Sequence, residues 1–332
     1  MPMSEAALRI GTSGWNYPSG RGTWNGIFYP PSRGRAKTFD ELSFYAEHFN
    51  TVEVNSTFYG QPRVDVCRAW AQRTPANFEF AVKLYQKFTH PKMYKQQFSR
   101  STGADASNAD DALLNALTKP NAADLDDFKR GVEPLASGGK LGPLLAQFPP
   151  SFKNDDAALD YLQWLLESFG NYQIAVELRH RSWSDAMGQT LALLNAHGAA
   201  FVQIDEPKFR LSIAQNQLPN LPTFYYMRLH GRNAAHWWSH DKSEDRYDYL
   251  YSARELQEFV ETIGSARSIV KKAYLYTNNH FSAKSIANAA MIKKQLGEPI
   301  EGEYSEEFRA RYPDVTIPTA PHALGTRSKP RE

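Results

Sequence analysis

The feature that most constrains the fold is a series of eight short apolar, β-branched or aromatic segments, separated by longer segments of helical character. Each short segment has the length of a strand, and helical crossovers between strands are typical of parallel sheets. The eight segments are residues 8–15, 51–59, 78–85, 141–149, 172–179, 199–205, 224–232 and 272–279. Eight parallel strands are the number that closes a TIM-type barrel. We therefore expect an α/β protein whose main domain, residues 1–296, is a single (β/α)8 barrel.

Several of the intervening segments carry signals for the start of a helix. Thr38 with Glu41, and Ser252 with Glu255, have the Ser/Thr-x-x-Glu spacing of a capping box. The sixth strand–helix unit is irregular, because residues 206–223 contain prolines and show little periodicity. We expect a loop or a short helix there.

Two additions to the barrel are predicted. Residues 99–119 are rich in Ala, Asp, Asn and Ser, which predicts an exposed insertion after the third strand. Residues 297–332 end in a polar, proline-containing sequence, which predicts a C-terminal extension that is partly disordered.

Composition limits the classes of function and the cellular location. The net charge is only +2, from 38 Lys and Arg against 36 Asp and Glu, which does not favour general attraction to nucleic acid or membrane. Cys67 is the only cysteine, which excludes an internal disulfide and favours a reducing compartment. The first residues lack a signal-peptide pattern, and no apolar run approaches the length of about 18 to 20 residues that a membrane span needs. We expect a cytoplasmic protein with no membrane partner, and the oligomeric state stays open.

Six segments carry a resemblance to a known family. The chain resembles the YecE-like proteins of the domain-of-unknown-function 72 family in segments that occur in the same order: IGTSGWNYPSGRGTW, FNTVEVNSTFYGQP, FAVKLYQKFTHP, KLGPLLAQFPPSF, AVELRHRSW and YMRLHGRN. The resemblance runs from about Leu8 to Leu296 and leaves out the insertion and the tail. It implies a TIM-type barrel and no particular activity. Arg181 departs from the pattern, which usually has Pro after the His, so a different turn geometry is expected there.

Polar residues gather where the predicted strands end, which is where a TIM barrel forms its active site. Alternation along a strand places Glu177 and Arg179 on one face, and Arg228 and His230 on one face. The candidate ligand-binding residues are Ser13, Trp15, Glu53, Asn55, Arg179, His180, Arg228 and Asn278. The candidate catalytic residues are Glu177, His230 and Lys83.

These charges need partners, because burying an unpaired ion costs several kcal/mol. One interpretation is structural, with Glu177 paired to Arg179 or Arg228. The other is a site for a small polar or anionic ligand, such as a phosphorylated or carboxylated sugar, whose charge Lys83, Arg179 and Arg228 neutralise. In an enzyme, Glu177 would be the general base and His230 the general acid of a hydrolase, isomerase or lyase.

Three alternatives stay open. No cofactor is predicted, but a divalent metal could be held by Glu53, Glu177, Asp205 and His230, the ligand types of barrel isomerases and endonucleases. Trp237 and Trp238, in the loop after the seventh strand, would suit a ligand lid or a nucleic-acid surface. The chain could thus be a metal-dependent nucleic-acid-processing or nucleic-acid-binding protein, although nucleic acid is not favoured. It could also be a non-catalytic ligand sensor or scaffold on an enzyme fold.

Overall fold

The strands occupy all eight predicted positions. The computed structural model describes residues 6–102, 117–215, 218–237 and 243–315. The strands of this part of the chain are β1 (Ala7–Thr12), β2 (Thr51–Val54), β3 (Glu79–Lys83), β4 (Leu141–Gln147), β5 (Ile174–Glu177), β6 (Ala200–Phe201), β7 (Gln203–Asp205), β8 (Phe224–Leu229) and β9 (Lys272–Thr277). The sixth predicted strand is interrupted at Val202 and gives both β6 and β7. The second is shorter than predicted, because the chain turns into a 3-10 helix after Asn55.

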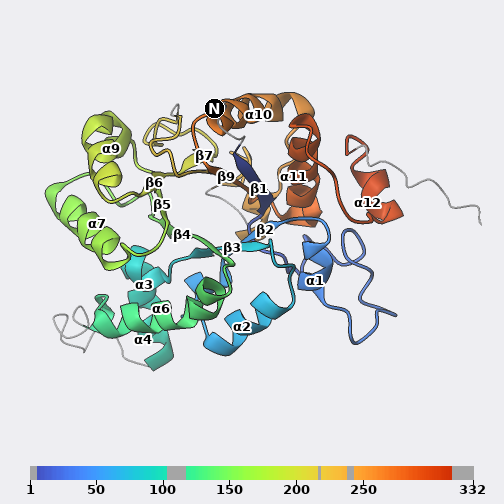
Figure 1. The fold of residues 1–332 in the computed structure, drawn as a ribbon, viewed down its shortest axis with the longest axis horizontal. Helices are drawn as coiled ribbons and strands as arrows, with labels where there is room; N and C mark the ends of the chain where they lie inside the picture. Colours follow the sequence, from blue (N-terminus) through green and yellow to red (C-terminus); the bar gives the residue numbers. More distant parts are fainter. Residues whose placement is uncertain (1–5, 103–116, 216–217, 238–242, 316–332) are drawn as a thin grey trace, which may run out of the picture.

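Helices surround the strands on all sides in Figure 1. The α-helices of the described residues are α1 (Glu41–Ala46), α2 (Val64–Gln72), α3 (Gln86–Thr89), α4 (Pro91–Thr102), α6 (Ala122–Ser137), α7 (Asp156–Ser168), α8 (Arg181–Asp185), α9 (Met187–Ala196), α10 (Ala253–Arg267), α11 (Lys284–Gln295) and α12 (Glu306–Arg311). The 3-10 helices are η1 (Ser56–Phe58), η2 (Ser243–Tyr247) and η3 (Phe281–Ala283). None of the helices in the described ranges is long and apolar enough to cross a membrane.

One of the two predicted capping boxes is confirmed. Ser252 accepts a hydrogen bond from the backbone N–H of Glu255, whose side chain accepts in return from the backbone of Ser252. The prediction for Thr38 is wrong, because α1 begins later and is capped by Asp40, whose carboxylate accepts from the backbone of the first turn. An aspartate satisfies these free N–H groups as well as a threonine does.

The structure tests three further predictions, for residues 206–223, 99–119 and 297–332, and it describes each of these ranges only in part. Residues 206–223 contain no helix in their described part, as expected for a loop. The first four residues of the predicted 99–119 insertion belong to α4, and positions 103–116 lie outside the described residues. In the C-terminal extension, α12 packs the buried side chain of Phe308 against Phe28 and leaves its other residues exposed, while residues 316–332 lie outside the described part.

All paired strands are parallel and form two sheets. One has the order β1-β9-β8-β7 and the other β2-β3-β4-β5-β6. The two sheets approach each other twice: Val202 alone separates β6 from β7, and Ser13 forms an isolated parallel bridge with Glu53 just past β1. The backbone N–H of Gly14 also donates to the carbonyl of Glu53 at 2.8 Å. The parallel α/β fold is therefore present, whereas closure into one barrel stays a prediction.

Gly11 marks the close approach of β1 to β2. A Cβ atom at Gly11 would lie 2.2 Å from the carbonyl oxygen of Thr51. We therefore expect Gly11→Ala to lower the free energy of unfolding by about 1–3 kcal/mol, the usual cost of overpacking, measured by urea unfolding. Gly188→Ala is the control, because nothing lies within 4 Å of a Cβ there. Equal stability of the two variants would contradict the close packing of β1 on β2.

Candidate functional site

Arg228 of β8 is the centre of a buried charged cluster. Its Nε and Nη2 donate hydrogen bonds to Oε2 and Oε1 of Glu53 at 2.8 and 2.7 Å. Tyr226 and Ser13 each donate one more to the same carboxylate, at 2.7 and 2.8 Å. Burial alone would raise the pKa of Glu53, but Arg228 holds it below its usual value. In this bidentate pair, both oxygens of Glu53 accept hydrogen bonds, and Nε and Nη2 of Arg228 both donate, as in a structural ion pair.

Glu177, the last residue of β5, is the second carboxylate of the cluster. Its Oε2 binds Nη1 of Arg228, and its Oε1 accepts from Nε of Arg179 at 2.7 Å. Glu177 and Arg179 therefore share a face, as the alternation predicts. Burial alone would raise the pKa of Glu177, but Arg228 and Arg179 hold it well below its usual value. An ionised carboxylate bound to two guanidinium groups is a weak base, so the geometry gives the predicted general-base role no support.

His230 lies just past β8 and faces both arginines. Its Nε2 lies 3.2 Å from Nη2 of Arg179 and 3.2 Å from Nη1 of Arg228, and it accepts because a guanidinium group only donates. Its Nδ1 lies 2.9 Å from the side-chain amide of Asn278. Burial, and then the charge of Arg228, lower the pKa of His230 to about 4. The ring is neutral near pH 7 and offers no proton at Nε2, so the predicted general-acid role gains no support either.

Mild acid is expected to destabilise the protein through His230. Its pKa of about 4 in the folded state lies below the value of about 6.5 for an unfolded chain, so the unfolded chain binds the proton first as the pH falls. Between about pH 6.5 and about pH 5, this removes about 1.5 kcal/mol of stability. The loss should be smaller in His230→Gln, measured by urea unfolding at both pH values. The lowered pKa values of Glu53 and Glu177 place their effect at lower pH. Identical losses in variant and wild type would contradict the prediction.

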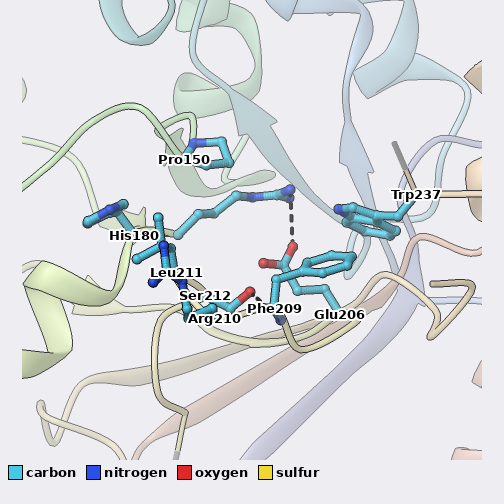
Figure 2. Close-up of a pocket in the computed structure, with 9 residues that line it drawn as sticks. Pro150, His180, Glu206, Phe209, Arg210, Leu211, Ser212 and Trp237 are labelled. Carbon is cyan, nitrogen blue, oxygen red and sulfur yellow. Dashed lines mark hydrogen bonds and ion pairs between the residues drawn. The ribbon is translucent and has the colours of Figure 1, made fainter. Parts of the chain in front are cut away.

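A pocket of about 350 Å³ opens beside this cluster. It is lined by Pro150, Arg179, His180, Glu206, Phe209, Arg210, Leu211, Ser212 and Trp237. Figure 2 shows Trp237 and Phe209 on one side of the pocket and His180 on the other. Trp237 therefore belongs to the pocket wall, whereas Trp238 lies outside the described residues. An apolar pocket with a few convergent polar groups is the usual form of a small-molecule site.

The loop after β7 builds one wall of the pocket by returning to the end of β5. Ser212 forms an isolated antiparallel bridge with His180. The backbone N–H of Arg181 donates to the carbonyl of Leu211 at 2.9 Å. A proline at position 181 has no N–H and could not make this hydrogen bond. The backbone of Arg181 therefore attaches the loop to the end of β5, and α8 begins at Arg181.

Arg179 and Glu206 meet at the pocket wall in an incomplete pair. Nη1 of Arg179 lies 3.2 Å from Oε2 of Glu206, yet this oxygen accepts no hydrogen bond from any described residue. Burial raises the pKa of Glu206, and Arg179 only partly opposes the rise. A carboxyl group that holds its proton closer to neutral pH can exchange it with a ligand. Nη1 of Arg179 therefore has no hydrogen-bond acceptor among the described residues, whereas Oε2 of Glu206 is enclosed by protein atoms.

Lys83 ends β3, close to the charged cluster but outside its hydrogen-bond network. Its Nζ lies 4.1 Å from the centre of the Phe58 ring. Burial and the charge of Arg228 lower the pKa of Lys83, and the charges of Glu177 and Glu53 oppose this. Lys83 makes no hydrogen bond or ion pair with these three side chains. Lys83 is thus in the expected region and has no hydrogen-bond or ion-pair partner among the described residues.

Three other predicted ligand-binding residues have different surroundings. Trp15 packs edge-to-face on Trp70 with ring centres 5.4 Å apart, so it anchors the first loop on α2. Asn55 precedes η1, and its side chain makes no hydrogen bond with the described residues. His180 lines the pocket and also caps α8, because its Nδ1 accepts from the backbone N–H of Ser182 at 3.1 Å.

The candidate metal ligands do not form one site: Nε2 of His230 lies 3.5 Å from Oε1 of Glu177, but the three carboxylates are bound by arginine. Asp205 accepts two hydrogen bonds from Arg232, at 2.7 and 3.0 Å, and one from Tyr251 at 2.7 Å. Glu53 and Glu177 are bound by arginine as described above. Across the described ranges, no group of three or more His, Cys, Asp or Glu side chains could hold a metal ion.

Most of the pocket residues could not be predicted from strand positions. Among them are Glu206, Phe209, Arg210 and Ser212. Glu206 carried a usable signal, since it follows directly on a strand end. The other three lie in an aperiodic loop whose position depends on contacts with the distant β5 end.

The fold and the site together define a parallel α/β protein with a buried arginine–carboxylate cluster and an adjacent pocket at the strand ends. A family model described as "Protein of unknown function DUF72" matches residues 9–310. The chain belongs to this family. The match passes Leu296 and reaches α12, so the expectation that the whole tail lies outside the family is wrong for its first part.

The relatives carry names without an assigned activity. The chain is similar to the UPF0759 protein YunF of Bacillus subtilis, with 28% identity over 309 residues that cover 90% of this chain and 96% of that protein. It is also similar to the UPF0759 protein YecE of Escherichia coli, with 29% identity over 140 residues, 42% of this chain and 41% of that protein.

Two solved structures have the same overall fold. A DUF72 family protein from Thermotoga maritima has 32% identity and a TM-score of 0.68, and the match covers 88% of this chain and all (100%) of that chain. A DUF72 family protein from Enterococcus faecalis has 22% identity and a TM-score of 0.70, covering 90% of this chain and 100% of that chain.

Proposed function

We propose that the chain binds a small anionic ligand, of the phosphorylated or carboxylated sugar type, in the pocket beside Arg179. The observation that carries this proposal is the incomplete contact between Arg179 and Glu206. Nη1 of Arg179 makes no hydrogen bond with the described residues, and Oε2 of Glu206 accepts none. Both atoms belong to residues that line the pocket. A ligand oxygen that accepts from Arg179 would complete its hydrogen bonds.

The charge and shape of the pocket also favour an anion attached to an apolar or sugar-like body. Arg179 and Arg210 line it, against the single carboxyl group of Glu206, whose pKa is raised by burial. Phe209 and Trp237 offer aromatic surfaces on one side. Aromatic faces pack well on the C–H faces of rings, while the arginines supply the charge-assisted hydrogen bonds.

If the ligand is turned over, Glu206 is the acid–base group that we propose for the reaction. Its raised pKa and its place in the pocket suit proton transfer better than the ionised Glu177 or the neutral His230. The reaction class stays the one predicted from the sequence, a hydrolysis, isomerisation or lyase step. Binding without turnover would make the protein a ligand sensor instead.

We also propose that the two sheets are halves of one TIM-type barrel. Side chains from both sheets meet between them: Glu53 of β2 and Glu177 of β5 bind Arg228 of β8. At the opposite end of the strands, Arg9 of β1 binds Glu79 of β3 at 2.8 Å. Such contacts across the interior are typical of a closed sheet.

Cys67, buried and unpaired with another cysteine, supports the proposal of a cytoplasmic location.

Calorimetric titration and thermal shift with a matched set of sugars test the binding proposal. The probes are glucose 6-phosphate, glucuronate, inorganic phosphate and neutral glucose. An anionic sugar at about 100 times its Kd should stabilise the protein by about 2.7 kcal/mol, because it binds only the folded state. Glucose at the same concentration should have no effect. An equal response to glucose and to both anionic sugars, or no response to any probe, would contradict the proposal.

A further inference from the structure

Lys83 differs from the other shielded lysines in having no polar partner. Nζ of Lys87 lies 2.8 Å from a carboxylate oxygen of Asp124. Nζ of Lys140 donates three hydrogen bonds, to the carbonyls of Ala71 and Thr74 and to the Thr74 hydroxyl. Nζ of Lys83 makes neither a hydrogen bond nor an ion pair with the part of the chain that the structure describes. It lies instead over the ring of Phe58, described above.

The groups around Lys83 do not supply a counter-ion. Glu53 and Glu177 are already bound by Arg228, as described above. The His90 ring packs edge-to-face on the Phe58 ring, with ring centres 4.9 Å apart. Burial, and then the charge of Lys83, lower the pKa of His90 to about 3. His90 is therefore neutral. A positive charge on Lys83 would face the cation of Arg228, and the charges of Glu177 and Glu53 offset the effects of burial and of Arg228 only in part.

The Lys83 side chain is nevertheless reachable in part. Lys83 is partly exposed, at the carboxyl end of β3. Burial of the side chain, and then the charge of Arg228, lower the pKa of Lys83 to about 7. A large share of the amine is therefore unprotonated at neutral pH.

We propose that Lys83 is a nucleophilic amine that forms an imine with an aldehyde or ketone substrate. The nitrogen lone pair attacks the carbonyl carbon, and the carbonyl oxygen takes up a proton to give a carbinolamine. Loss of this oxygen as water leaves the C=N bond, so water is the only other product. The expectation that the substrate also carries a carboxylate or phosphate rests on the proposed anionic ligand, whereas the reactivity of the amine does not.

Reductive trapping tests the inference on the full chain. The protein is incubated near pH 7 with sodium cyanoborohydride and either neutral propanal or anionic glyoxylate, and each lysine is then quantified by peptide mass spectrometry. Exposed Lys92 is the internal reference. We expect Lys83 to be alkylated at least about tenfold faster than Lys92, because its lower pKa leaves far more free amine. Lys83→Arg keeps the charge without the nucleophile, and its Lys92 should be modified as in wild type.

The two reagents separate this inference from the proposed function. Alkylation of Lys83 no faster than Lys92 with both reagents would overturn the inference, whatever the pocket binds. Preference for Lys83 with propanal, without a further gain with glyoxylate, would support the reactive amine and count against the anionic substrate. If Lys83→Arg does not fold, Lys83→Met is the second variant. The ratio of Lys83 to Lys92 alkylation in the wild-type protein decides the question without either variant.

Discussion

Replacing Arg228 with methionine is expected to lower the free energy of unfolding by about 3–5 kcal/mol, the cost of breaking a buried ion pair by removing one partner. Arg228 is 1% exposed, and its two carboxylate partners, Glu53 and Glu177, are 0% exposed. Without the guanidinium group, the Glu53 carboxylate keeps the hydrogen bonds from Ser13 and Tyr226 and no others from the described residues. The decrease should appear as a lower urea midpoint.

Two further variants make the Arg228 result specific. Arg228→Lys keeps a charge but not the two-pronged donor, so it should be intermediate in stability and gives a reading if the methionine variant does not fold. Arg181→Met removes an exposed arginine that pairs with Asp185 within α8. It should change stability by no more than about 0.5 kcal/mol. Equal urea midpoints for Arg228→Met and Arg181→Met would contradict a structural role for the buried pair.

Replacing Arg179 with glutamine is expected to weaken the binding of an anionic ligand by about ten- to a hundredfold, the value of one charged hydrogen bond. Arg179 is partly exposed at the pocket, with 12% of its side chain accessible, and it has Nη1 available. Glu177 would still be held by Arg228, so the loss of stability should be smaller than in the Arg228 variants. Calorimetric titration with the best anionic sugar measures the Kd.

Arg210→Gln is the matched comparison for binding. Arg210 also lines the pocket but is exposed, so its charge is better screened by solvent and its loss should cost less affinity than that of Arg179. If Arg179→Gln binds as tightly as wild type while Arg210→Gln does not, the anion does not bind at Arg179.

The strand positions could be predicted because a buried parallel strand needs a short run of apolar residues that is visible in the local sequence. Each of the eight predicted segments contains a strand, and the split of the sixth depends on one residue, Val202. Strand ends were harder to predict. The sequence of residues 56–58 suits a strand as well as the 3-10 helix that forms, and only its surroundings decide. Asp40 rather than Thr38 caps α1 for the same reason, since both residues have suitable side chains.

The sequence predicted which charged side chains of the cluster share a strand face. It did not predict the pocket. Alternation placed Glu177 with Arg179, and Arg228 with His230, because a strand has a fixed period of two. It could not show that Arg228 would choose Glu53 from the other sheet, since that choice depends on the strand arrangement. The pocket depends on an aperiodic loop held by distant backbone contacts, which leave no periodic signal in the sequence.

We propose that the cluster has two parts: a complete structural pair, Arg228 with Glu53, and an incomplete contact, Arg179 with Glu206, beside which an anionic ligand binds. A crystal structure of the protein grown with glucose 6-phosphate tests this division most directly. We predict phosphate oxygens within hydrogen-bonding distance of Nη1 of Arg179, with Arg228 still bound to Glu53. Phosphate bound at Arg228 with the Glu53 pair broken, or a pocket left without phosphate at a saturating concentration, would contradict it.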